Sequence, residues 1–139
     1  MSLADYYTQM TVQPEIPEDL LTEAELDFLA RFGIEAEKIG HRKLYYLYAA
    51  EYDATGYDYD EGGDGDEDEL IEFCQALIKS SKGRLKFIYF EFAYTCNRMR
   101  PGAFGGGAYF ITATGFQFVS TSQWLMERVN EVETGNTRD

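Results

Sequence analysis

Residues 85–95 read LKFIYFEFAYT, and this stretch decides how the rest of the chain is interpreted. Most of its residues are aromatic or β-branched, and such side chains fit the pleated, half-buried surface of a sheet. Its apolar run is far shorter than the ~20 residues that a membrane-spanning helix needs. We therefore predict a long β-strand over 85–95.

Two further strands are predicted downstream of this segment. Residues 109–113 and 116–120 are apolar or aromatic, and Thr114-Gly115 stands between them. A glycine suits the positive φ of a two-residue hairpin turn. In that register Ile111 faces Phe118. We expect strand 85–95, a glycine-rich connection over 96–107 and this hairpin to form an antiparallel meander.

Upstream, a helix and another strand are predicted. Apolar residues at the i, i+3, i+4 and i+7 positions of a helix occur in 67–79, namely Leu70, Phe73, Cys74 and Leu77. Over 43–52, apolar and aromatic residues fill both faces of a period-two pattern, which is typical of a strand covered on both sides. We expect these elements to form a β-α-β unit with a right-handed crossover into 85–95.

Capping patterns mark two more helices. Thr22 with Glu25 predicts the start of a helix over 23–32, and Ser120 with Gln123 predicts one over 121–132. The last helix is expected to bury a stripe of three residues, Leu125, Val129 and Val132.

The predicted fold class is α+β, a mixed four-stranded sheet with helices packed on it in the order α-β-α-β-β-β-α. The 139 residues are enough for one domain, predicted over 18–132. Residues 1–17 contain Pro14 and Pro17 and are predicted to be an irregular arm. Residues 133–139 are predicted to be a frayed tail.

The charge is strongly negative and unevenly distributed. The net charge is −13, from 12 basic and 25 acidic residues. Residues 1–37 and 51–72 contribute −8 and −11, so the remainder contributes −13 + 19 = +6. This balance lacks the basic footprint of a direct nucleic-acid binder. The sequence also shows no signal peptide and no membrane span, so we expect a cytoplasmic protein.

Acidic segments of this kind favour a non-enzymatic interaction protein that binds a basic partner protein electrostatically. A nucleic-acid-binding protein is a natural partner, because a row of carboxylates resembles a row of phosphates and would make this chain a nucleic-acid mimic. No oligomeric state is predicted. The predicted partner-binding residues are Glu23, Asp27, Tyr57, Asp58, Tyr59, Asp60, Asp64, Asp66, Arg98 and Arg100.

An alternative is a divalent-ion module at the acidic loop over 58–69. Five residues match calcium-ligand positions of an EF-hand loop: Asp58, Asp60, Asp64, Asp66 and Glu69. Gly62, however, stands where the motif needs a side-chain oxygen, and a predicted strand precedes the loop instead of a helix. Calcium is therefore a weak prediction, and no other cofactor is expected.

A third alternative is an enzyme that acts on a small anionic substrate at the 96–107 loop. Arg98 and Arg100 would hold the anion there, with Glu91 or Cys96 as the reactive neighbour. His41 is the single histidine, which argues against a zinc site of several imidazoles and against a histidine triad at this loop.

Overall fold

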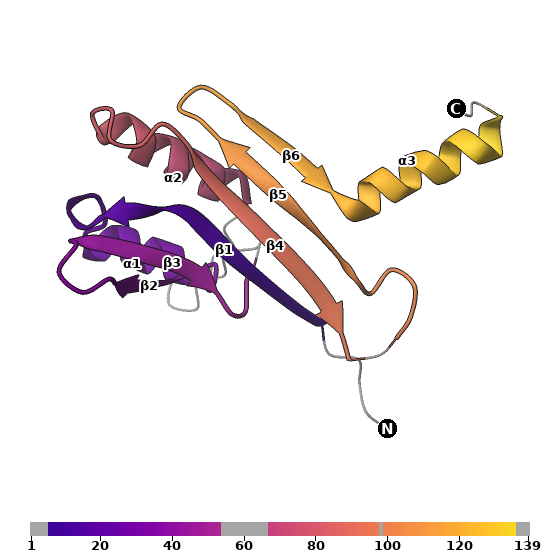
Figure 1. The fold of residues 1–139 in the computed structure, drawn as a ribbon, viewed down its shortest axis with the longest axis horizontal. Coiled ribbons are helices and arrows are strands. Elements are labelled where there is room, and N and C mark those ends of the chain that lie inside the picture. Colours follow the sequence, from indigo (N-terminus) through magenta and orange to yellow (C-terminus); the bar gives the residue numbers. More distant parts are fainter. Residues whose placement is uncertain (1–5, 54–66, 98, 136–139) are drawn as a thin grey trace.

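The computed structural model describes residues 6–53, 67–97 and 99–135. Within these residues three α-helices accompany one six-stranded sheet (Figure 1). The strands are β1 (Tyr6–Pro17), β2 (Glu35–Lys38), β3 (Leu44–Ala49), β4 (Ile88–Cys96), β5 (Gly105–Ile111) and β6 (Phe116–Ser120). The helices are α1 (Glu23–Ala30), α2 (Glu67–Ser80), α3 (Thr121–Thr134) and the short 3-10 helix η1 (Glu18–Leu20).

The strand order is β2-β3-β1-β4-β5-β6, and every neighbouring pair is antiparallel. The α+β class is confirmed, whereas the predicted four strands, the element order and the mixed sheet are wrong. The segment β3-α2-β4 does connect two strands that run the same way. Because β1 lies between these strands and pairs with both, no parallel pair forms.

The prediction of an irregular arm over 1–17 is wrong for residues 6–17, which form the central strand β1. Two prolines argued against a strand, because proline has no N–H to donate to a ladder. The pairing with β4 ends at Gln13, before Pro14, and the pairing with β3 shifts between Val12 and Ile16. The prolines therefore lie where β1 has lost its β4 neighbour.

The β5–β6 hairpin has a different register from the predicted one. Ile111 pairs with Phe116 and Tyr109 with Phe118, which displaces the expected pairing by two residues. The loop is wider than a two-residue turn, and the Thr112 amide closes it by donating to the Gly115 carbonyl at 2.9 Å.

Helices α1 and α2 cover one face of the sheet (Figure 1). Alternate residues of the central strands point toward these helices, including Val12, Leu47 and Phe90, which are almost fully buried. Leu29 of α1 and Leu70 of α2 meet them in one hydrophobic cluster. Burial of apolar side chains at this interface supplies most of the stabilisation of the fold.

Helix α3 projects away from this core (Figure 1). Its N-cap prediction is confirmed, since Ser120 Oγ accepts from the Gln123 amide at 3.1 Å. The predicted buried stripe is wrong, because no residue of α3 is buried. The helix also continues to Thr134 and ends at Gly135 in the left-handed conformation, so residues 133–134 are not a frayed tail.

At α1 the predicted capping box is replaced by a side-chain contact. Thr22 Oγ1 donates to the Glu25 carboxylate, and its side chain makes no hydrogen bond to the helix backbone. The start of α1 at Glu23 is nevertheless as predicted.

Candidate functional site

The face of the sheet opposite α1 and α2 is open and carries carboxylates beside tyrosines. The strand registers place Glu35, Tyr48, Thr11 and Glu91 in one row across β2, β3, β1 and β4. Glu35, Thr11 and Glu91 are exposed, and Tyr48 is half-buried. We call the surface made by Glu35, Glu37, Tyr46, Tyr48 and Glu91 the acidic sheet face.

The charge of this face has one sign. Neighbouring residues of a strand point to opposite faces, so Glu37 and Tyr46 lie on the same side as Glu35 and Tyr48. Of the described strand residues that point to this side, none is lysine or arginine. The three glutamates therefore stand on rigid strands with no cation on the same side of those strands, since Lys38 of β2 points to the other side.

The tyrosines of this face are held in place by their neighbours. The rings of Tyr46 and Tyr48 stack with centroids 5.3 Å apart. Tyr48 donates its hydroxyl to Glu37 Oε1 at 3.0 Å. This hydrogen bond, with smaller contributions from desolvation and the charge of Glu35, raises the pKa of Tyr48 above its usual value. The aromatic and carboxylate groups thus form one ordered surface.

A shallow hollow of about 570 Å³ lies on this face between the tyrosines of β3 and the glutamate of β4. Its lining includes Gln9, Thr11, Tyr46, Tyr48, Glu91 and Ala93. Carboxylates and phenol rings together suit a guanidinium or ammonium group, which is attracted both by negative charge and by the face of an aromatic ring.

Of the predicted partner-binding residues, three lie in the described part of the chain and are exposed there. Glu23 and Asp27 stand on α1, on the helical side of the molecule, and Arg100 stands in the loop before β5. The structure therefore does not bring the two α1 acids onto the acidic sheet face. The remaining predicted residues lie outside the described residues: Tyr57, Asp58, Tyr59, Asp60, Asp64, Asp66 and Arg98.

Cations from elsewhere in the chain neutralise part of the acidic segment over 1–37. Glu15, Glu18 and Asp19 each have a cationic partner, in the pairs Arg42–Glu15, Lys38–Glu18 and Arg84–Asp19. The forked hydrogen bonds from Arg84 lower the pKa of Asp19. The acids of the sheet face stand apart from these three pairs.

The calcium prediction falls mostly outside the described residues. Its one described member, Glu69, lies in α2 with its carboxylate 4.0 Å from the Arg31 guanidinium. Among residues 6–53, 67–97 and 99–135, no group of three or more His, Cys, Asp and Glu side chains is arranged to hold a metal ion.

The groups proposed for enzymatic chemistry are dispersed in the described residues. Glu91 is exposed in the middle of β4, Cys96 is buried at its end, and Arg100 follows in the loop. The Cys96 thiol donates to Asn97 Oδ1 at 3.8 Å. Arg98 lies outside the described residues.

The sequence analysis did not predict a polar cluster at the start of α2, formed by Tyr52, Glu67 and Tyr109. Tyr52 donates to Glu67 Oε2 at 2.7 Å, and Tyr109 donates to the other oxygen of the same carboxylate. Desolvation first, and then the hydrogen bond to Glu67, raises the pKa of both tyrosines. The cluster ties the start of α2 to β5 and to the segment after β3, so its role is structural.

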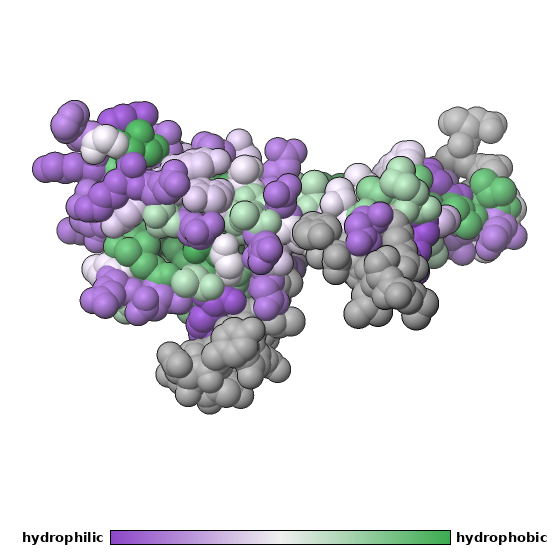
Figure 2. Space-filling model, turned by 90° about the horizontal axis from the view of Figure 1, so that it is seen from below, coloured by the Kyte–Doolittle hydropathy of each residue, from purple (hydrophilic) through white to green (hydrophobic). Residues whose placement is uncertain are grey.

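A second surface, made by β6 and α3, carries apolar side chains, and we call it the apolar arm. Eight of its large apolar residues are exposed: Phe116, Phe118, Val119, Trp124, Leu125, Met126, Val129 and Val132. Hydrophobic surface accordingly appears at the α3 end of the molecule in Figure 2. The pattern of α3 predicts its apolar stripe, but not that the stripe lacks cover.

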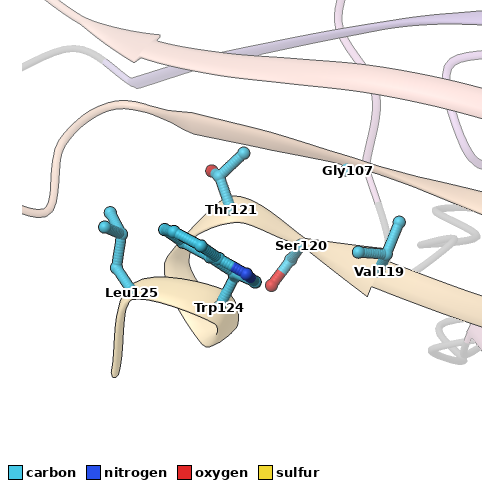
Figure 3. Close-up of a pocket in the computed structure, with 6 residues that line it drawn as sticks. All are labelled: Gly107, Val119, Ser120, Thr121, Trp124 and Leu125. Carbon is cyan, nitrogen blue, oxygen red and sulfur yellow. The ribbon is translucent and has the colours of Figure 1, made fainter. Parts of the chain in front are cut away.

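The base of the arm contains an apolar pocket of about 330 Å³ (Figure 3). It is lined by Gly107, Val119, Ser120, Thr121, Trp124 and Leu125. The first turn of α3 is fixed there, because Gly106 donates its amide to Thr121 Oγ1 at 3.1 Å and the hydroxyls of Tyr94 and Ser122 share a hydrogen bond. The arm is therefore held in a defined direction at its root.

Comparison with known proteins finds no relative for this arrangement: no protein-family model matches, and no match is found among curated proteins or solved structures. No helix in the described part of the chain is long and apolar enough to cross a membrane. Fold and site together define an α+β protein with an open acidic sheet face at one end and an apolar arm at the other.

Proposed function

We propose that this chain is a non-enzymatic interaction protein that binds a basic partner protein through the acidic sheet face. The observation that carries the proposal is the row of Glu35, Tyr48 and Glu91 on rigid strands, with Glu37 and Tyr46 beside it and no cation on the described strands of that side. Preorganised charges and rings bind at a lower entropic cost than groups on a loop.

The charge of the partner follows from the chemistry of this surface. Three carboxylates attract lysine and arginine side chains, and the tyrosine rings favour the planar guanidinium of arginine. A net charge of −13 also steers basic molecules toward the chain over long range. A nucleic-acid-binding protein of the cytoplasm supplies such a basic surface, and the acidic face would then occupy the place of phosphates.

The test is binding of a fluorescein-labelled arginine-rich peptide, followed by fluorescence anisotropy at low salt. The variant E35Q/E37Q/E91Q removes the three carboxylates of the acidic sheet face. We expect the Kd for the peptide to rise by at least about tenfold, which corresponds to roughly 1.4 kcal/mol. Added salt should weaken the wild-type complex because it screens these charges.

The matched control is E23Q/D27N/E72Q, which removes three exposed carboxylates from α1 and α2 on the helical side. Both triple variants have the same net charge, so a difference between them reports the location of binding. We expect the control to change the Kd by less than about threefold. If the control weakens binding as much as the sheet-face variant does, a general charge effect replaces the proposed site.

A further inference from the structure

The apolar arm begins in an uncharged part of a highly charged chain. No charged residue and no histidine occurs between Pro101 and Met126, a stretch that contains all of β5 and β6 and the first turn of α3. In a chain with 25 acids and 12 bases, this is the segment where a second negatively charged molecule meets the least repulsion.

The two edges of the sheet differ in their protection against pairing. The edge strand β2 reads EAEK and is charged at three of four positions. The opposite edge strand β6 reads FQFVS and carries neither a charge nor a proline. Natural proteins protect free edges with such residues, so an unprotected apolar edge indicates a surface that pairs with another chain.

Helix α3 continues this surface beyond the sheet. Leu125, Val129 and Val132 recur at helical spacing and are 55%, 48% and 68% exposed. Glu127 and Glu131 lie on the opposite side of α3. Arg128 and Glu133 border the stripe, and Arg128 is engaged by Glu131 at 2.8 Å and by the Trp124 ring. An exposed apolar stripe of this kind marks a site of contact with another molecule.

The exposed apolar area of the arm sets an upper bound on the interface that it can form. Its eight exposed apolar side chains are each roughly half exposed and together present on the order of 700–900 Å². They lie on more than one side of the arm, since Val119 and Phe118 point to opposite faces of β6, so this area is the most that a single partner can bury. A specific interface of standard size buries about 800 Å² on each partner.

We propose that the apolar arm is the dimerisation surface of this chain, covered by the arm of a second copy about a twofold axis. A twofold contact is self-complementary, which suits a surface without charge of either sign on β6 and on the first turn of α3. It also places the two acidic bodies at opposite ends, because α1 and α2 lie away from α3 (Figure 1). β6 and the first turn of α3 carry no carboxylate, so this part of the arm does not attract a basic partner.

A lipid surface is the less favoured occupant. The polar side of α3 carries Glu127, Glu131 and Glu133 against the single cation Arg128, whereas helices that lie on anionic membranes carry lysine and arginine there. The second copy is therefore the occupant that the charges of the arm favour.

The test is the molar mass of the full chain in sedimentation equilibrium, up to about 100 µM. We expect the wild type to reach twice its chain mass of 15.9 kDa. The variant L125E/V129E places two carboxylates in the apolar stripe and should raise the dimer Kd by about a hundredfold or more. Its circular dichroism should stay that of a folded chain, because both positions are exposed.

The matched control is Q123E/N130E, which adds the same two charges to exposed positions of the same helix away from the stripe. It should remain dimeric. A monomeric wild type overturns the proposal, as does a stripe variant that still dimerises or a control that dissociates equally. A monomer that binds vesicles of phosphatidylcholine and phosphatidylserine overturns it in favour of a lipid.

A second measurement follows the edge of β6 directly. Amide hydrogen exchange in Phe116–Ser120 should slow as the protein concentration rises through the dimer Kd, while exchange in β2 stays constant. Equal rates in β6 at all concentrations contradict pairing there. The dimer is independent of the proposed function, since a monomer that still binds the arginine-rich peptide removes only the dimer.

Discussion

The two ends of this molecule differ in whether their apolar side chains are buried within the chain. At one end β1, β3 and β4 bury Val12, Leu47 and Phe90 beneath α1 and α2, within a body that carries most of the acids. At the other end β6 and α3 have similar apolar content but no buried residue in α3. The difference shows that an amphipathic pattern predicts an apolar contact, but not whether the contact is made within the chain.

The largest contrast between the two ends should be seen in stability. Phe90→Ala removes an almost fully buried ring, so we expect the free energy of unfolding to fall by about 3–5 kcal/mol. Trp124→Ala on the arm should lower it by less, about 1–2 kcal/mol, since the ring is 53% exposed and loses its contact with Arg128 and its part in the pocket at the base of the arm.

Urea denaturation measures both values, in the L125E/V129E background, where association does not contribute. Comparable losses at the two positions would mean that the arm is packed in solution against its own chain, and the contrast drawn between body and arm would be wrong.

The junction between body and arm should be the next most sensitive place. A Cβ at Gly107 would collide with the Val119 carbonyl oxygen and with the Phe92 ring. We expect Gly107→Ala to lower the free energy of unfolding by about 1–3 kcal/mol, by forcing β5 and β6 apart.

The control at the junction is Gly115→Ala, where a Cβ meets nothing within 4 Å. It should leave the urea midpoint of β5–β6 unfolding nearly unchanged. If Gly107→Ala leaves the free energy of unfolding unchanged, β6 does not pack as closely on β5 as it does in the structure.

The tyrosine–glutamate cluster should give a smaller effect, which depends on pH. Tyr109→Phe removes one of the two hydrogen bonds to Glu67, so we expect a loss of about 1 kcal/mol at pH 7. Folding raises the pKa of Tyr52 and Tyr109, so their contribution is present below the unfolded pKa of about 10 and is lost as the pH rises above it.

The pH dependence is measured as the urea midpoint between pH 8 and pH 11. Wild type should lose more stability above pH 10 than the Y52F/Y109F variant does. Parallel curves for the two proteins would contradict the neutral, carboxylate-bonded tyrosines of the structure.

The smallest effect is expected at the ion pair Arg84–Asp19. Both side chains are largely exposed, and solvent and salt screen exposed pairs. Because Arg84 lowers the pKa of Asp19, the contribution of the pair is present above the unfolded pKa of about 4 and is lost as the pH falls below it. Asp19→Asn should leave the melting temperature at pH 7 and physiological salt indistinguishable from that of the wild type. A clear drop in the melting temperature would show that the Arg84–Asp19 pair stabilises the fold measurably.

Local patterns in the sequence predicted several elements well. The helical period in 67–79 and the aromatic run in 85–95 correspond to α2 and β4, and the Ser120–Gln123 cap marks the start of α3. These features depend on interactions within a few residues. Pairing between distant strands does not depend on such local interactions. The local pattern therefore could not show that β1, despite Pro14 and Pro17, inserts between β3 and β4.

The candidate surfaces were predicted less well for the same reason. The sequence shows where acids are dense, but Glu15, Glu18 and Asp19 acquire cationic partners only through the fold. The row of Glu35 and Glu91 across four strands depends on β2, whose four residues EAEK lack the apolar alternation that indicates a strand.

The separation of the two surfaces is the central claim, and backbone amide shifts in ¹H–¹⁵N spectra test it most directly. One series adds the arginine-rich peptide, and the other dilutes the protein. We predict that the peptide moves resonances of β1, β2, β3 and β4, and that dilution moves those of β6 and α3. Peptide shifts confined to α1 and α2, or one common set of residues in both series, would contradict the account.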